Sequence, residues 1–417
     1  MNQQIKQRIK QIKNGEVPYG YKKIKIGIVP NEWKEFYLED LFNVIDGDRG
    51  EKYPSKDEIF DSGYCVFLNA KNITKNGFDF NHIQYISEEK DKELRNGKLE
   101  KFDIVLTTRG TIGNVALNDN IKYENLRINS GMVLLRSENL KYIKYVYMYM
   151  KSKLFIHQVD KISFGSAQPQ LTVKEIKKFK VVIPINETEQ QKIADILSTQ
   201  DKVIELKEKL LKEKEKQKKY LMQNLLTGKK RLKGFEGEWE EKLICDVFKI
   251  TRGNVLAISL IRVQQDEEYI YPVYSSQTKN NGLLGYYNQS LYENAITWTT
   301  DGANAGFVAY REGKFYCTNV CGVLLDDKGN ANECIAQILN SKTKYYVSYV
   351  GNPKLMNSVM AEIKIKFPPL EEQKAIAEIL TTADKELKLL QEELEEEKRK
   401  KKALMQLLLT GIVRVKV

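Results

Sequence analysis

Histidine, cysteine and proline are scarce in this sequence of 417 residues, and their scarcity excludes several kinds of chemistry. The only histidines are His82 and His157, far apart in the sequence, so neither an imidazole mechanism nor a histidine zinc site is expected. The five cysteines are odd in number and scattered, which is typical of reduced thiols. Cys317, Cys321 and Cys334 lie close enough to suggest a metal cluster, but we favour small side chains packed in a core.

Long apolar runs are also absent. No stretch reaches the ~18 consecutive apolar residues that a membrane span requires. Residues 1–6 lack the apolar core of a secretion signal. Hydrophobic residues make up 42% and charged residues 29%, which is ordinary for a protein with buried cores, and the length suggests about two or three domains. We therefore expect a cytoplasmic protein that does not associate with a membrane.

The sequence signatures of catalysis are missing as well. The nearest fragment of a phosphate-binding loop, residues 228–230, lacks the rest of that motif, and no Asn/Asp-Pro-Pro-Tyr/Phe tetrapeptide of amino-methyltransferases is present. Residues 175–177 and 362–364 fit the Glu-x-Lys half of a nuclease metal site, but neither has a convincing Pro-Asp upstream. We favour solvated strand edges for both, and expect neither catalytic residues nor a metal in this chain.

Positive charge is present in excess. Lysine and arginine total 67, aspartate and glutamate total 56, and the net charge is +11. A surplus of this size suits a polyanionic partner such as nucleic acid. Charge alone does not decide the matter, because many basic proteins bind no nucleic acid.

An internal repeat organises the whole chain. Residues 189–197 recur as 372–380, and the offset between matching residues is 376 − 193 = 183. Residues 221–223 match 404–406, and residues 225–228 match 408–411, at the same offset. An offset without insertions is expected where helical register sets the packing, whereas upstream matches such as Trp33 with Trp239 are looser. The chain is thus predicted to alternate two variable globular parts with two constant helices.

Capping signals place the domain boundaries within this repeat. Asn186 and Glu189 form a capping-box-like start after Pro184, and Gly228 and Gly411 are natural helix ends. The predicted segments are a basic N-terminal segment (1–30), a first globular domain (31–185), a central helix (186–228), a second globular domain (229–368), a second helix (369–411) and a tail (412–417).

Both helices carry the alternating spacing of four and three residues that is typical of a coiled-coil seam. Gln200, Lys207, Lys214 and Lys218 interrupt the first seam, and acidic residues within 392–397 of the second helix could face these lysines. The alternative is that these charges are merely solvated. The apolar seam positions are Ile193, Leu197, Ile204, Leu211, Leu221 and Leu225 in the first helix, and Ile376, Leu380, Leu387, Leu390, Leu394, Leu404 and Leu408 in the second.

Short connections make two such helices antiparallel if they pack on each other within one chain. The two globular parts would then lie at opposite ends of a rod of about 60 Å, related by an approximate twofold axis. Each part mixes strands, predicted at 104–106, 132–135, 180–183 and 363–365, with tyrosine-rich helices at 142–156 and 334–350. We expect these tyrosines to pack in the cores rather than to form a base-stacking surface.

This layout resembles the specificity subunits of type I restriction–modification systems. The resemblance rests on the Glu-Gln-Gln/Lys-x-Ile-Ala-x-Ile-Leu helix starts and the Leu-Met-Gln…Leu-Leu-Thr-Gly helix ends, and it covers nearly the whole chain. It implies an α/β fold class in which two target-recognition domains are separated by two long helices, packed as an intramolecular antiparallel coiled coil in a pseudo-twofold tandem repeat. It also implies a role in host defence, each domain reading one half of a split, asymmetric sequence in double-stranded DNA.

The resemblance further implies a division of labour between subunits. The constant helices would space the half-sites and dock two methyltransferase (modification) subunits, which would bind S-adenosylmethionine and methylate adenine. Restriction subunits would add translocation and cleavage that depend on ATP and magnesium. This chain would itself be a non-catalytic specificity subunit without a cofactor.

Loops that carry basic, amide and hydroxyl side chains are the DNA contacts that the resemblance implies, since such groups pair with base edges and phosphates. Asp301 stands where Arg109 stands in the first domain, which puts a shared phosphate contact in doubt and fits different half-sites. The predicted contacts are Arg49, Lys52, Lys71, Asn72, Thr108, Arg109, Ser166, Gln168 and Gln170 in the first domain, and Arg252, Gln277, Thr278, Lys279, Asn280, Thr300, Asn304 and Lys354 in the second.

Two alternatives stay open at this point. A self-sufficient DNA methyltransferase or nuclease would act without partners, although its signatures are missing. A sequence-blind coiled-coil scaffold would carry basic charge only for solubility, and would bind DNA weakly through phosphates.

Overall fold

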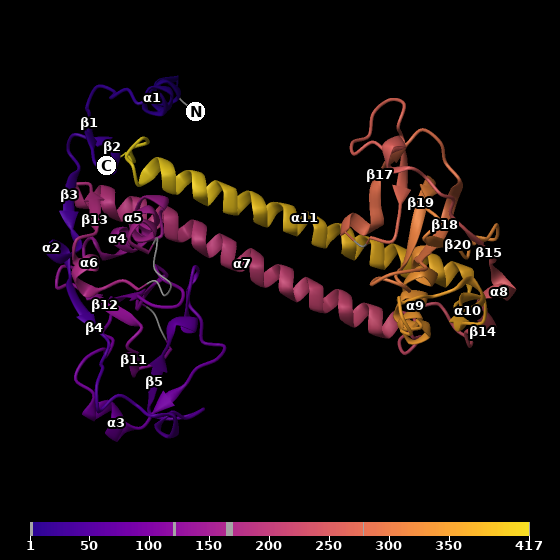
Figure 1. The fold of residues 1–417 in the computed structure, drawn as a ribbon, viewed down its shortest axis with the longest axis horizontal. Coiled ribbons are helices and arrows are strands. Elements are labelled where there is room, and N and C mark those ends of the chain that lie inside the picture. Colours follow the sequence, from indigo (N-terminus) through magenta and orange to yellow (C-terminus); the bar gives the residue numbers. More distant parts are fainter. Residues whose placement is uncertain (1–2, 120–121, 164–169, 278, 417) are drawn as a thin grey trace. The chain divides into compact units, whose positions relative to one another are not determined.

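The computed structural model describes residues 3–119, 122–163, 170–277 and 279–416. The chain forms two compact units: unit 1 comprises residues 1–206 and 394–417, and unit 2 comprises residues 207–393. Two helices of 39 residues each, α7 (Glu187–Leu225) and α11 (Leu370–Leu408), contribute to both units (Figure 1). Within the described ranges, no helix combines the length and the apolar character needed to span a membrane.

Unit 1 is built around an antiparallel sheet in the order β10-β9-β12-β4 and a second, mixed sheet in the order β11-β5-β8. The strands of the first sheet are β4 (Asn43–Asp46), β9 (Ile104–Thr107), β10 (Val115–Leu117) and β12 (Met132–Arg136). Those of the second are β5 (Cys65–Leu68), β8 (Tyr85–Ile86) and β11 (Leu126–Ile128). Three strand pairs complete the unit: β1 (Tyr21–Ile24) with β2 (Gly27–Pro30), β3 (Lys34–Tyr37) with β13 (Lys180–Ile183), and β6 (Ile73–Thr74) with β7 (Gly77–Phe78).

Short helices pack around these sheets in unit 1. The apolar face of α4 is fully buried, because Tyr145, Val146 and Tyr149 lie in the same core as β9 and β13. The helices are α1 (Gln3–Lys13), α2 (Leu38–Leu41), α3 (Glu88–Glu93), α4 (Ile143–Met150), α5 (Lys153–Ser163) and α6 (Val173–Lys177), with 3-10 turns η1 (Lys56–Glu58) and η2 (Ala70–Asn72).

Unit 2 has one six-stranded sheet in the order β15-β20-β18-β19-β16-β17. Its strands are β15 (Lys249–Arg252), β16 (Tyr271–Tyr274), β17 (Leu283–Tyr287), β18 (Tyr292–Thr299), β19 (Val308–Cys317) and β20 (Cys321–Leu325). A separate pair joins β14 (Glu240–Leu243) to β21 (Lys364–Phe367). The helices are α8 (Ile244–Val247), α9 (Glu333–Lys342) and α10 (Asn357–Ala361), with 3-10 turns η3 (Ile258–Leu260), η4 (Lys279–Gly282) and η5 (Thr343–Tyr346).

The predicted duplication is confirmed by the strand order. The sheet β10-β9-β12-β4 of unit 1 has the same neighbours as β19-β18-β20-β15 of unit 2. The register agrees as well. Val133 of β12 lies opposite Asp46, the last residue of β4, and Gly322 of β20 lies opposite Arg252, the last residue of β15. Each unit also repeats the strand pair that frames the core, β3 with β13 and β14 with β21.

In unit 1, the first half of α7 lies beside the last part of α11. Asn186 caps α7, because its side-chain oxygen accepts the backbone N–H of Thr188 at 2.9 Å. Further along, the Gln200 amide donates to the Glu397 carboxylate at 2.5 Å, and Lys401 forms an ion pair with Asp201. Ile193 and Leu197, near the start of α7, share a core with Leu408 and Leu409 at the end of α11, whereas Gln200, further along α7, contacts Glu397, further back along α11. The two helices are therefore antiparallel here.

In unit 2, lysines of α7 meet carboxylates of α11. Lys207 pairs with Glu393 and Lys214 with Glu386, both at 2.6 Å, and Lys218 pairs with Asp384. The same reversed numbering shows an antiparallel pair. The predicted coiled coil is therefore confirmed, and Glu393 does face a seam lysine. Lys214 and Lys218 instead pair with acids nearer the start of α11.

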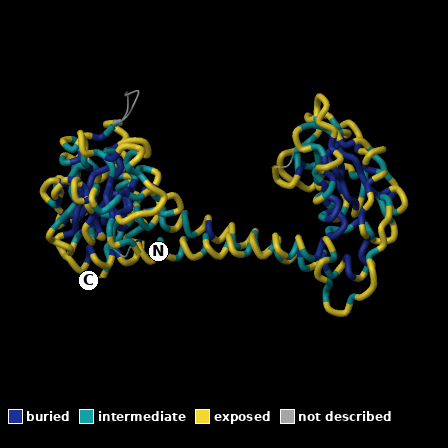
Figure 2. The backbone as a smooth tube through the Cα atoms, turned by 90° about the horizontal axis from the view of Figure 1, so that it is seen from below, coloured by how far each residue is buried: buried dark blue, intermediate teal, exposed yellow. Residues whose placement is uncertain are grey.

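Every predicted apolar seam residue is buried or half-buried, whereas three leucines beside the seam are exposed. Leu206, Leu210 and Leu389 are 53%, 44% and 59% exposed. Figure 2 shows fully buried residues gathered inside each unit and largely exposed or half-buried residues along the helices. The heptad spacing therefore distinguishes these three leucines from the seam residues.

Some expected elements differ from the structure. The helix expected at 142–156 is divided, because the chain turns at Lys151 and Ser152 so that α5 packs Phe155 and Val159 into the same core. The helix expected at 334–350 ends at Lys342. Here the Thr343 hydroxyl donates to the Gly306 carbonyl at 2.6 Å, and the chain tightens into η5.

Two further expectations need correction. Tyr345 and Tyr349 follow the end of α9 and are 87% and 69% exposed, so the tyrosines of this segment are not core residues, unlike Tyr145 and Tyr149 in unit 1. Residues 175–177 lie in helix α6, not at a strand edge. By contrast, strands occur where they were predicted, at β9, β12, β13 and β21.

Candidate nucleic-acid interface

Each unit has a cluster of loops at the ends of three neighbouring strands of its sheet. We call this cluster a corner. The first corner comprises residues 46–49, 108–110 and 129–131, and the second comprises 252–254, 300–302 and 318–320. In the first, the backbone N–H of Thr108 donates to Gly131 at 2.8 Å; in the second, the N–H of Thr300 donates to Val320 at 3.0 Å. A later segment of the chain packs against each corner. The backbone N–H of Leu171 donates to the Thr108 carbonyl, and that of Leu355 donates to the Thr300 carbonyl. The two corners therefore share one backbone framework.

A glycine permits the close approach of loops in each corner. A Cβ atom on Gly47 would lie 2.1 Å from the carbonyl oxygen of Asn129, and one on Gly253 would lie 2.3 Å from those of Cys317 and Thr318. Real Cβ atoms do not approach backbone oxygen this closely, so no larger residue fits without moving the loop. These glycines hold the end of β4 and of β15 against the neighbouring turn.

Charged side chains of the second corner gather around Asp301. The Arg252 guanidinium donates to the Thr300 hydroxyl oxygen at 3.1 Å and to the Asp301 carboxylate at 3.3 Å. Lys354 lies 3.9 Å from the same carboxylate. Arg252 and Lys354 are about half exposed, whereas Thr300 is buried and holds the turn. Three predicted contact residues are thus brought together around a carboxylate.

The first corner carries the opposite arrangement of charge. Register and backbone contacts place Asp46 at the position of Arg252, Arg109 at that of Asp301, and Gln170 at that of Lys354. Asp46 pairs with Arg49 at 3.1 Å. Arg109 is exposed, and no described residue forms an ion pair with it. The same scaffold therefore displays different chemistry in the two units.

Three of the predicted contacts are buried within the protein and do not face solvent. Asn72 is 2% exposed, and its amide donates to the carbonyls of Asp79 at 3.0 Å and His82 at 2.9 Å. Thr108 and Thr300 are each 1% exposed. Such burial argues against direct DNA contact by these three side chains. The pattern of polar loop residues could not distinguish a side chain that faces solvent from one that braces a turn.

The remaining predicted contacts lie on loop surfaces or beyond the described residues. Lys52, Lys71, Lys279, Asn280 and Asn304 are exposed, and Gln170 and Gln277 are half-buried. Gln277 donates its side-chain amide to the Leu283 carbonyl, so it holds the loop between β16 and β17. Ser166, Gln168 and Thr278 lie outside the described residues.

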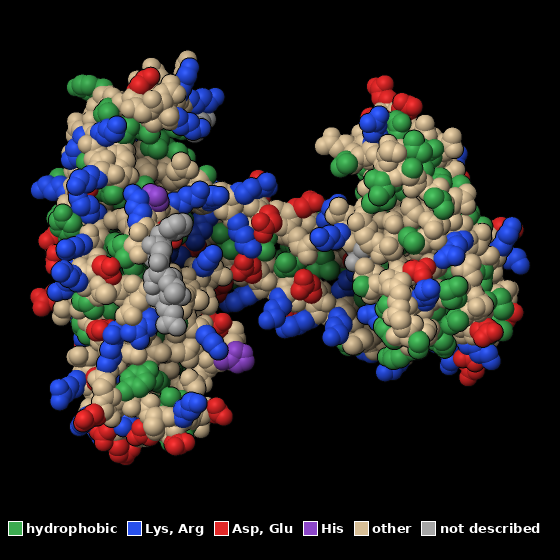
Figure 3. Space-filling model, in the orientation of Figure 1, with side chains coloured by type: hydrophobic (Ala, Val, Ile, Leu, Met, Phe, Trp, Pro, Cys, Tyr) green, Lys and Arg blue, Asp and Glu red, His purple; other side chains and the backbone are tan. Residues whose placement is uncertain are grey.

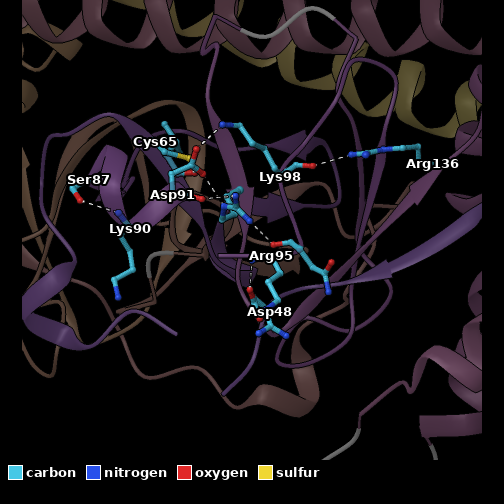
Figure 4. A network of polar contacts seen from close by, with 11 residues as sticks. Asp48, Cys65, Ser87, Lys90, Asp91, Arg95, Lys98 and Arg136 are labelled. Atoms are coloured by element: carbon cyan, nitrogen blue, oxygen red, sulfur yellow. Dashed lines mark hydrogen bonds and ion pairs between the residues drawn. The ribbon is translucent and has the colours of Figure 1, made fainter. Parts of the chain in front are cut away.

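A polar network that is buried at Asp91 and Arg127 supports the loop after β4 in unit 1 (Figure 4). The Asp48 carboxylate accepts the backbone N–H groups of Arg95 at 2.6 Å and Arg49 at 2.9 Å. Beside it, Arg127 pairs with Asp91 at 2.8 Å, and both are about 97% buried. Sequence reasoning missed these residues, because positions 48, 91 and 127 carry no local signal of their association.

Electrostatics in this network favour the ionised carboxylate. Burial alone would raise the pKa of Asp91, but hydrogen bonds from Lys98 and Arg127 and the charge of Arg127 hold that pKa below its ordinary value. The nearby Cys65 thiol lies in the opposite situation, since burial raises its pKa to about 12. The network is thus a charged brace, and its cysteine is an unreactive thiol.

Cys317, Cys321 and Cys334 of unit 2 are buried in the sheet and the helix that covers it, whereas Cys245 is exposed. Burial raises the pKa of Cys321 to about 11 and that of Cys334 to about 12. Among the described residues, no group of three or more histidine, cysteine, aspartate or glutamate side chains is placed to hold a metal ion. On the face drawn in Figure 3, lysine and arginine side chains are spread over unit 1, while apolar side chains cover more of unit 2.

Two α/β units that repeat one scaffold with different loop chemistry, each containing part of an antiparallel helix pair, define a duplicated DNA-specificity protein. The family described as type I restriction modification DNA specificity domain matches the chain twice, over residues 30–216 and 236–398. The chain belongs to this family. It is a DNA sequence-recognition subunit of a type I restriction–modification system. The family is of the general non-catalytic kind.

Relatives and solved structures agree with this assignment. A protein of Mycoplasma pneumoniae named as a type I specificity subunit is 35% identical over 222 residues, which are 52% of this chain and 80% of that protein. The MjaX specificity subunit of Methanocaldococcus jannaschii is 27% identical over 95% of this chain and 97% of its own length. A crystal structure of a type I S subunit from M. genitalium covers 90% of this chain and 96% of its own, with a TM-score of 0.64 and 18% identity, which shows a shared fold.

Proposed function

We propose that each unit reads one half of a bipartite, asymmetric DNA target and that the helix pair sets the distance between the halves. The first globular domain (31–185) and the second (229–368) would each supply one corner. Family membership supports a DNA-recognition role, and the two different corners support two different half-sites. The approximate twofold relation and the rod-like spacing remain predictions of this proposal.

The observation that carries the proposal is the exchange of side chains on a common backbone. Arginine pairs with the two acceptors of guanine, glutamine with adenine, and a carboxylate accepts from cytosine. The first corner offers Arg109 and Gln170 where the second offers Asp301 and Lys354. Matching scaffolds would therefore present different donors and acceptors to the two half-sites.

Partner subunits would supply the chemistry. The proposal includes two methyltransferase subunits that bind S-adenosylmethionine and methylate adenine, and restriction subunits that use ATP and magnesium for translocation and cleavage. The outward faces of α7 and α11 offer exposed leucines, Leu206, Leu210 and Leu389, as apolar area for docking. In this arrangement, the chain described here binds DNA and its partners and carries out no bond-making step.

Methylome sequencing of cells that carry this chain with its partner subunits tests the proposal. The expected result is a two-part adenine-methylation motif with unlike halves. Exchanging residues 31–185 for those of another family member should change one half only, and exchanging residues 229–368 should change the other. A change of both halves by either exchange would contradict the two-reader proposal. Methyl transfer by the purified chain alone would instead establish the enzyme alternative.

A further inference from the structure

Arg311 is a buried cation that makes its direct contacts with neutral groups. It lies on β19, is 4% exposed, and forms no ion pair with any carboxylate of the described residues. Its Nε donates to the Thr297 hydroxyl oxygen at 3.0 Å, and its Nη1 donates to the Asn281 carbonyl at 2.6 Å. The guanidinium also lies 3.8 Å above the centre of the Tyr274 ring. Its direct contacts are thus neutral groups and a ring face, and the Glu333 carboxylate of α9 acts on its charge only from beyond ion-pair distance.

The buried arginine of unit 1 shows how unusual this is. Arg127 is equally buried, but it pairs with the Asp91 carboxylate and also donates to the carbonyls of Asp91 and Asn96. Burying an unpaired charge is costly in free energy, so such a group is retained where it serves a purpose. Burial lowers the pKa of Arg311 from its ordinary value, which reflects the same cost.

The loop that Arg311 contacts has an unfavourable backbone conformation. Asn280, Asn281 and Gly282 have φ angles of +49°, +54° and +84°, three successive residues in the left-handed region. Residues other than glycine disfavour this region, although asparagine tolerates it better than most. A loop of this kind persists only when surrounding contacts determine it. The contact with the Asn281 carbonyl lies at the centre of this turn.

The same turn presents two predicted DNA contacts. Lys279 and Asn280 are exposed, while the base of the loop is fixed by the Ser275 N–H, which donates to the Gly282 carbonyl at 3.1 Å. An amide such as that of Asn280 can pair with adenine, and an ammonium such as that of Lys279 with guanine or phosphate. Their positions depend on the turn that Arg311 holds from beneath.

We propose that Arg311 is a positioning residue for recognition of the second half-site: it holds the 279–282 turn in the conformation that presents Lys279 and Asn280 to DNA. This inference rests on the proposed function of unit 2 as a reader of one half-site. It predicts that loss of the guanidinium disturbs the reading of that half alone. Arg311 itself would not touch DNA.

The test compares R311M and R311K with T297V in the full chain, assembled with its partner subunits. T297V is the matched control, because it removes the contact of Arg311 with the sheet and leaves the contact with the turn. Backbone amide exchange of residues 279–282 should be about 10- to 100-fold faster in R311M, since a hydrogen bond from a charged donor is lost. T297V should stay within about twofold of wild type, and R311K should lie between the two.

Methylome sequencing of the same variants provides the second readout. R311M should relax base preference in the half-site of unit 2 and leave the other half unchanged, and R311K should restore part of the preference. Unchanged amide exchange in R311M, unchanged base preference, or equal effects in T297V would each overturn the inference. If R311M does not fold, R311K is judged by the same two readouts. Faster amide exchange together with altered base preference in both half-sites would contradict the two-reader function. It would still show that Arg311 holds the turn.

Discussion

At the scale of single residues, buried carboxylates fix the start of each long helix. In unit 2, Arg231 pairs with Glu372 through two contacts of 2.6 Å, and the Trp239 indole donates to the same carboxylate at 3.0 Å. In unit 1, Arg414 pairs with Glu189 in the same way. Both glutamates are at most 1% exposed. The chain segment after each long helix therefore fastens the beginning of the other.

Removing either arginine should destabilise its own unit. R231A should lower the unfolding free energy of unit 2, and R414A that of unit 1, by about 3 kcal/mol, because each leaves a buried carboxylate without its arginine partner. Amide exchange resolved by unit measures both, and each variant serves as the other's control. Glu372→Gln combined with R231A should recover part of the loss. Equal stability of R231A and wild type would show that the pair does not hold the helix start.

The Asp91–Arg127 pair should make unit 1 sensitive to acid. The pKa of Asp91 is held below its ordinary value of 3.8, so the stabilisation is complete above that value and is lost as pH falls through the lower folded pKa. The stability difference between wild type and D91N should be constant above about pH 5 and shrink below about pH 4. Urea unfolding of both proteins from pH 6 to pH 3 measures this. A difference that grows on acidification would contradict the ion pair.

Residue-level chemistry was only partly accessible from the sequence. Arg252, Thr300 and Lys354 were selected as separate loop residues, and the structure brings them together. Asn72 looked like a contact and is instead buried, because its amide bonds the carbonyls of Asp79 and His82, and the residue pattern does not show how the loop folds onto it. Arg311 was missed because its partners Thr297 and Asn281 lie further away in the sequence. A charged residue in a strand gives no local sign of burial.

At the scale of elements, the helix pair combines an apolar seam with interhelical charge pairs. The pair between Lys207 and Glu393 is partly exposed, with side chains 26% and 56% accessible. Exposed pairs contribute modestly to stability, but like charges at such positions are unfavourable. Their main effect is therefore on register and partner choice within the seam.

Reversing one charge should weaken the helix pair, and reversing both should restore it. K207E should lower the melting temperature, corresponding to a loss of about 0.5–1 kcal/mol, and the double variant with Glu393→Lys should recover most of that. Thermal unfolding at low and high salt measures the effect, which should diminish with salt. Lys219→Glu, an exposed position on the same helix, is the control. Failure of the second reversal to restore stability would contradict direct pairing.

The elements differ in how well the sequence predicts them. The long helices follow from periodicity over 39 residues, and their cap at Asn186 and seam positions are local signals. The short strands of unit 1, such as β6 and β8 of two residues each, depend on partners far along the chain. The end of α9 was missed because a tertiary hydrogen bond from Thr343 decides it.

At the scale of the whole molecule, the duplicated plan is what the sequence predicts best. The fixed offset of the helix segments and the repeated strand order describe the same event of tandem duplication. Because the corners diverge while their backbone stays the same, the plan suits a protein that must recognise unlike sequences with one architecture. The spacing of its two readers is the part of this account that depends most on the helices.

A matched shortening of both helices tests that central claim most directly. Deleting residues 208–214 and 386–392 together removes one heptad from each helix and keeps Lys207 with Glu393 and Lys218 with Asp384. The helices would shorten by about 10 Å, or about three base pairs of DNA. Methylome sequencing with the partner subunits should show the same two half-sites separated by a spacer about three base pairs shorter. The same half-sites with an unchanged spacer would contradict the claim that the helix pair sets their separation.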